Sequence, residues 1–201
     1  MKNASLPGTP SLRIVVVFGD SITAGNELPD PAACWVSLVQ RQTMGHLEVI
    51  NEGKGGRLTD SIQEFGEMLL RHPRADLLVL ALGTNDSRTI KEECVPNAVA
   101  NLRSMIRLAR MTYGPNLAIL LIGPPNLRKD TLGPTRNIAD MRNAKLRELG
   151  TAYQVLAHET DSGFLSFYGA LPPESLAKDG VHPDAAGNEQ LAKLILPVLL
   201  A

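Results

Sequence analysis

Short apolar runs alternate along the chain with longer segments whose apolar residues recur every three or four positions. The runs at 12–18 and 77–82 are almost unbroken, which is typical of strands covered on both faces of a sheet. The longer segments carry helical periodicity, as Val99, Leu102 and Ile106 do. We expect strands at 12–18, 47–50, 77–82, 117–122 and, with the weakest pattern, 153–157. We expect helices at 35–43, from an N-cap at Thr59 onward, and at 97–112, 138–149 and 185–196.

Strands that alternate with helices in this way predict an α/β fold, because a parallel sheet needs a crossover helix between successive strands. We expect a single three-layer α/β/α domain with a mostly parallel sheet of about five strands. A chain of 201 residues fits one domain, here 12–201 preceded by an extension at 1–11. The long connections at 83–95 and 123–135 both follow strand ends, so we expect them to contact substrate at one edge of the sheet.

Composition excludes several function classes. The net charge of −1 gives no electrostatic reason to expect a nucleic-acid partner. No apolar stretch approaches the roughly 20 residues of a membrane span, so we expect no integral membrane segment. Cys34 and Cys94 have neither metal-binding nor CxxC spacing, and we expect free thiols and a cytoplasmic location. The apolar tail at 194–200 covers the core or joins a subunit interface, which leaves a homo-oligomer open.

Ser21 follows the first apolar strand directly, in the run Gly19-Asp20-Ser21. In open α/β sheets ligands bind at the carboxyl ends of strands, so Ser21 is a candidate nucleophile. A serine hydroxyl needs a base to take its proton. His182 is the best candidate, because Asp179 lies three residues before it and can orient the imidazole. The other three histidines, His46, His72 and His158, are expected to be surface or structural residues.

Two glycine-bearing segments follow the next strands and can supply donors for an oxyanion. One is Gly53-Lys54-Gly55-Gly56, and the other is Gly83-Thr84-Asn85-Asp86. Neither has the GxxxxGK[ST] or GxGxxG pattern of a phosphate-binding loop. No serine lies in a G-x-S-x-G elbow, which argues against an ordinary α/β-hydrolase.

These four segments, in this order, resemble the motif blocks of the SGNH hydrolases, the GDSL family of esterases and lipases. The resemblance runs from Gly19 to the last helix and implies a flavodoxin-like domain without metal or organic cofactor. By position, Ser21 would be the nucleophile, His182 the general base and later the general acid, and Asp179 the residue that orients it. The oxyanion hole would combine the Ser21 N–H, the Gly56 N–H and the Asn85 amide, with Gly53 and Gly55 competing for the place of Gly56. Asp20 and Asp86 would brace their turns.

The resemblance implies a serine esterase that acts on a small-molecule ester. The run from Gly19 to Gly25 and the following Trp35 look like those of small bacterial arylesterases and short-chain carboxylesterases. Leu127, Leu132 and Pro134 suggest an apolar rim for a small acyl or aryl group. Thioesterases, lysophospholipases and carbohydrate acetylesterases share the four blocks, and acyl transfer to another acceptor would use the same residues. The alternative of another class is an inactive ligand-binding module with the same fold.

Overall fold

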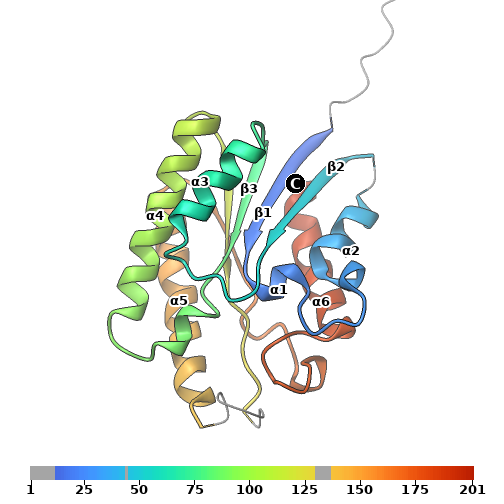
Figure 1. Cartoon of the computed structure of the whole chain (residues 1–201), viewed down its shortest axis with the longest axis vertical. Helices are drawn as coiled ribbons and strands as arrows, with labels where there is room; N and C mark the ends of the chain where they lie inside the picture. The colour runs from blue at the N-terminus through green and yellow to red at the C-terminus, as the bar shows by residue number, and fades with distance from the viewer. Residues whose placement is uncertain (1–11, 44, 130–136) are drawn as a thin grey trace, which may run out of the picture.

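Five parallel strands form one central sheet in the computed structural model, which describes residues 12–43, 45–129 and 137–201 (Figure 1). The strands lie in the order β2-β1-β3-β4-β5, and each neighbouring pair is parallel. This is the strand order of flavodoxin-like folds, in which ligands bind beyond the carboxyl ends of the strands. The predicted fold class is therefore confirmed. The strands are β1 (Arg13–Gly19), β2 (Leu47–Gly53), β3 (Leu77–Ala81), β4 (Ala118–Gly123) and β5 (Gly163–Ser166).

Helices cover both faces of the sheet. Side chains alternate along β1: Val16 and Phe18 belong to the core beneath α3, α4 and α5, and Val15 and Val17 to the core beneath α1, α2 and α6. Figure 1 shows these two groups of helices on opposite sides of the strands. Burial on both faces explains why β1, β3 and β4 are nearly continuous apolar runs. The helices are α1 (Ser21–Ala24), α2 (Trp35–Gln42), α3 (Ile62–Arg71), α4 (Cys94–Tyr113), α5 (Ala139–Glu159) and α6 (Ala185–Leu200).

The fifth strand lies later in the chain than the sequence pattern predicts. Residues 153–157 continue α5, and β5 follows at Gly163–Ser166. The buried residues Leu146, Leu149, Tyr153 and Leu156 recur at helical spacing on one face, and the helix runs through Gly150 without ending. The prediction ended the helix too early because a glycine followed by mixed polar and apolar residues is typical of a helix end.

The start of α3 also differs from its prediction. Ser61 is the N-cap and the helix begins at Ile62, whereas Thr59 binds Asp86 on the neighbouring loop. At the other end of the chain, the apolar tail belongs to α6. Its residues Leu191, Ile195 and Leu199 are fully buried beneath the sheet, so the tail covers the core.

The carboxyl ends of β1 and β2 are packed closely against α1. A Cβ on Gly53 would lie 2.3 Å from the backbone nitrogen of Ala24, so only glycine fits at the end of β2. A Cβ on Gly19 would lie 2.1 Å from Oγ1 of Thr23. The turn after β2 is thereby held beside the first residues of α1, which begin at Ser21.

Candidate active site

Ser21 lies where β1 turns abruptly into a helix. Asp20 is the N-cap of α1, and its carboxylate accepts a hydrogen bond of 3.0 Å from the N–H of Ile22. Ser21 is the first residue of α1, so its own N–H has no carbonyl within the helix to bind. The residue is mostly buried at the carboxyl end of the sheet. This placement presents both a hydroxyl and a backbone donor at the edge where ligands bind.

Ser21, His182 and Asp179 form a continuous hydrogen-bonded series. His182 Nε2 lies 2.8 Å from Ser21 Oγ, although the two residues are 161 positions apart in the sequence. His182 Nδ1 lies 2.5 Å from Asp179 Oδ2. We assign the neutral ring the tautomer in which Nδ1–H donates to the carboxylate, which leaves Nε2 to accept the serine proton. The structure thus brings the three predicted residues together.

Asp179 also shapes the turn that carries His182. Its Oδ1 accepts the N–H groups of Val181 at 2.9 Å and His182 at 3.1 Å. Burial alone would raise the pKa of Asp179, but these backbone donors and the bond to His182 outweigh it and lower the pKa. The carboxylate is therefore ionised at neutral pH, as a group that orients an imidazole must be.

Asn188 of α6 anchors the loop that follows His182. Its side-chain amide donates to the carbonyls of Pro183 and Asp184, both at 3.0 Å. Its Oδ1 accepts the N–H of Trp35 at 2.9 Å, which ties this loop to the start of α2. The sequence contains a signal for this role that the motif analysis did not use, namely a polar residue on the apolar face of the last helix.

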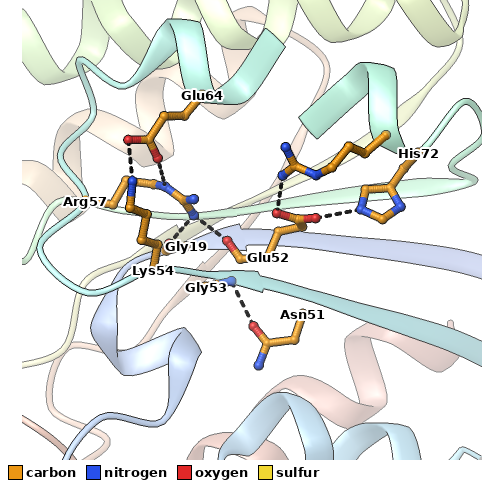
Figure 2. Close-up of polar contacts among 9 residues, drawn as sticks. Gly19, Asn51, Glu52, Gly53, Lys54, Arg57, Glu64 and His72 are labelled. Atoms are coloured by element: carbon orange, nitrogen blue, oxygen red, sulfur yellow. Dashed lines mark hydrogen bonds and ion pairs between the residues drawn. The ribbon is translucent and has the colours of Figure 1, made fainter. Parts of the chain in front are cut away.

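Asn85 and Gly56 come from neighbouring turns that contact each other. The Asn85 amide donates to the carbonyl of Arg57 at 3.0 Å, and an amide has a second N–H for a ligand. Gly56 adopts a left-handed conformation with φ of +76°, which favours glycine. Gly53, one of the competing glycines, donates its N–H to Asn51 Oδ1 at 2.9 Å, as Figure 2 shows. These contacts favour the later glycines of the run as oxyanion donors.

Asp86 braces the same region, as expected. Its carboxylate accepts the hydroxyl of Thr59 at 2.5 Å and the N–H of Thr59 at 3.2 Å. Burial raises the pKa of Asp86, and these donors oppose the shift. The contact joins the turn after β3 to the segment that leads into α3.

The remaining candidates lie away from the hydrogen-bonded series. His72 pairs with Glu52 at the end of α3 with a distance of 2.6 Å, and His46 and His158 are exposed. Leu127 is buried in the core beneath α4 and α5, so the prediction that it forms an apolar rim is wrong. Leu132 and Pro134 lie outside the described residues.

The buried carboxyl of Asp20 should make the stability of the fold depend on pH. Its burial raises the pKa of this carboxyl to about 6, against hydrogen bonds from Ile22 and Thr84 that lower it. The folded state then holds more protons than the unfolded state between about pH 4 and 6, so stability falls as pH rises through that window. Asp20→Asn removes the buried charge and keeps an acceptor for Ile22.

We therefore expect Asp20→Asn to raise the free energy of unfolding at pH 7, by on the order of 2 kcal/mol. The gain should shrink to near zero at pH 4, where both residues are neutral. Denaturant unfolding of the two proteins at pH 4, 5, 6 and 7 measures it. A gain that is the same at every pH would show that the pKa of Asp20 does not differ between the folded and unfolded states.

A serine, a histidine and a carboxylate bonded in series at the carboxyl edge of a parallel sheet define a site of the hydrolase class. A family model described as the GDSL-like Lipase/Acylhydrolase family matches residues 17–190. The chain belongs to this family, and the protein is an ester-hydrolysing enzyme.

Comparison with individual proteins finds relatives that are themselves described as lipases or esterases. The chain is 29% identical over 197 residues to a GDSL lipase of Mycobacterium tuberculosis, covering 94% of this chain and 82% of that protein. The structure of a carbohydrate acetylesterase family member from Sinorhizobium meliloti matches with a TM-score of 0.77 and 26% identity, over 94% of this chain and 97% of the other. The aryl esterase of M. smegmatis matches with a TM-score of 0.79 over 94% and 98%, but at 22% identity this likeness concerns the fold alone.

Two further expectations concern the environment of the protein. Among the described residues, no helix has the length and apolarity needed to cross a membrane. Cys34 and Cys94 are both buried free thiols, as predicted. The cytoplasmic location inferred from them stays a prediction.

Proposed function

We propose that this enzyme hydrolyses carboxylic esters through an acyl-enzyme on Ser21. The observation that carries the proposal is the geometry of His182, whose Nε2 lies 2.8 Å from Ser21 Oγ while Nδ1 lies 2.5 Å from Asp179. The first distance is within hydrogen-bond reach of the proton that a general base must remove. The second fixes the tautomer and stabilises the imidazolium that forms.

The reaction then proceeds in two halves. His182 takes the proton of Ser21 as Oγ attacks the ester carbonyl, and a tetrahedral oxyanion forms. The C–O bond to the alcohol breaks, His182 gives its proton to the leaving oxygen, and the acyl group stays on Ser21. Water repeats the attack with His182 as base, and the acid leaves as Oγ regains its proton.

Asn85 is proposed to stabilise the oxyanion together with the N–H groups of Ser21 and Gly56. Asn85→Ala should lower kcat by about 100-fold to 1,000-fold with a small change in KM, because this hydrogen bond strengthens in the transition state. Steady-state kinetics on an aryl acetate tests it. Asn126→Ala, whose amide binds the carbonyl of Leu171, is the control, since it removes a loop contact of the same kind. A kcat close to wild type in Asn85→Ala would remove Asn85 from the oxyanion hole.

Short acyl or aryl esters are the proposed substrates, because the run from Gly19 to Gly25 and the following Trp35 look like those of small arylesterases. Acetylated carbohydrates are the second candidate, because the chain is similar to a carbohydrate acetylesterase family member.

A substrate panel distinguishes these candidates. Aryl esters with acyl groups from acetyl to long chains are compared with an acyl thioester and an acetylated sugar. The proposal predicts the highest kcat/KM for the shortest acyl groups on aryl alcohols. A maximum with the acetylated sugar would favour the second candidate, and a maximum with long chains or thioesters would contradict both. Product analysis with added alcohol separates hydrolysis from acyl transfer.

A further inference from the structure

Arg57 follows the glycine turn directly and is almost entirely buried, with 5% of its side chain exposed. Figure 2 shows its guanidinium between the carboxyl ends of β1 and β2, at Gly19 and Glu52, and the side chain of Glu64 on α3. Nη1 donates to the carbonyl of Gly19 at 2.7 Å and also to the carbonyl of Glu52, and Nε lies 3.2 Å from Oε2 of Glu64. The guanidinium carbon also lies 3.9 Å from the centre of the Phe18 ring.

These contacts join the ends of β1 and β2. Gly19 is two residues before Ser21, and Glu52 is four residues before Gly56. The Gly19 carbonyl accepts a second donor from the same turn, the N–H of Lys54 at 3.1 Å. A movement of the turn that carries Gly56 would therefore break bonds to Gly19 at the end of β1, the strand that leads into Ser21.

The backbone of Arg57 contacts Asn85, the third of the proposed oxyanion donors beside Ser21 and Gly56. Its carbonyl accepts the Asn85 amide at 3.0 Å, and its N–H donates to the carbonyl of Lys54 at 3.3 Å, which closes the turn. One residue thus holds the three groups proposed as oxyanion donors: Ser21 through Gly19, Gly56 through the turn, and Asn85 through its own carbonyl.

We propose that Arg57 is a positioning residue of the oxyanion hole, an inference that rests on the proposed function of Ser21. Arginine suits this role because a planar guanidinium binds several acceptors in a fixed geometry and stacks on an aromatic ring. Lysine has neither property. Glu64 compensates the buried charge and is itself held by Lys54 at 2.8 Å. Misplacing oxyanion donors weakens transition-state binding more than substrate binding.

Three variants test the proposal by kinetics on an aryl acetate, below the unfolding temperature and per mole of folded enzyme. Arg57→Met should lower kcat by about 10-fold to 100-fold with KM changed less than about threefold. The kcat of Arg57→Lys should lie between the kcat of Arg57→Met and that of wild type. The matched control is Arg71→Met, because Arg71 binds the side-chain carboxylate of Glu52 at 2.6 Å, whereas Arg57 binds the backbone carbonyls of Gly19 and Glu52. Its kcat should stay within about twofold of wild type.

A double-mutant cycle separates positioning from a purely structural role. If Arg57 acts by placing Asn85 and Gly56, Arg57→Met should reduce kcat several-fold less in an Asn85→Ala background than in wild type. The same factor in both backgrounds, or a normal kcat in folded Arg57→Met, would overturn the proposal. If Arg57→Met does not fold, the cycle is run with Arg57→Lys and the same criteria. Failure of the proposed function would show differently, as activity retained by Ser21→Ala.

Discussion

Ser21→Ala is expected to lower kcat by about 100,000-fold or more, because no other group replaces the nucleophile and the remaining site gives only residual catalysis. The fold should persist. Ser21 Oγ binds His182 Nε2, and alanine fits the first position of α1 without loss of the Asp20 cap. We expect the Tm to stay within about 3 °C of wild type. Stopped-time assays on an aryl acetate with thermal unfolding in parallel measure both quantities.

Ser37→Ala is the matched control for this variant. Ser37 lies on α2, is half-buried and has its hydroxyl 3.2 Å from Sγ of Cys34. Its replacement removes the same group from a site without the proposed chemistry, and kcat should stay within about twofold of wild type. Ser21→Ala with more than a few per cent of wild-type activity would exclude Ser21 as the nucleophile.

Asp179→Asn is expected to lower kcat by about 1,000-fold to 10,000-fold at neutral pH. The asparagine keeps an oxygen for the N–H groups of Val181 and His182, so the turn should survive. Its amide nitrogen, however, would face His182 Nδ1 and donate to it. The imidazole would then carry its proton on Nε2, where it can no longer accept from Ser21.

Asp184→Asn is the control for Asp179→Asn. Asp184 is the N-cap of α6 and accepts the N–H of Gly187 at 2.9 Å, and asparagine caps helices about as well as aspartate. Both kcat and Tm should therefore stay close to wild type. If Asp179→Asn kept most of its activity while folded, orientation of His182 by the carboxylate would not be part of the mechanism.

The strands were predictable where burial on both faces made them continuous apolar runs, as in β1 and β3. The edge strand β5 was not, because its four residues Gly163–Ser166 are only partly buried and carry little apolar signal. The neighbouring stretch 153–157 of α5 has more apolar residues, and its pattern alone predicts a strand there. The helical spacing of Leu149, Tyr153 and Leu156 favours the helix that the structure has, but Gly150 interrupts the pattern and makes a helix end look plausible at that point.

The candidate site was predictable in part because each of its blocks is short and lies at a strand end or before the last helix. Ser21 and His182 each have a local motif that identifies them. Arg57 and Asn188 do not, since their roles depend on partners 38 and 153 positions away. The sequence marks Asn188 as a polar residue on an apolar helix face, but the partners of both residues are set by the packing of the turns and need a structure to be found.

The most direct test of the proposed mechanism is to trap the covalent intermediate. Wild-type enzyme is mixed with an aryl acetate, quenched in acid during turnover, and analysed by intact mass and peptide mapping, with Ser21→Ala treated in parallel. The mechanism predicts one added acetyl group on the peptide that contains Ser21, and none in the variant. Turnover without acetylation of Ser21, or with an acetyl group that forms and decays at the turnover rate on another residue, would contradict it.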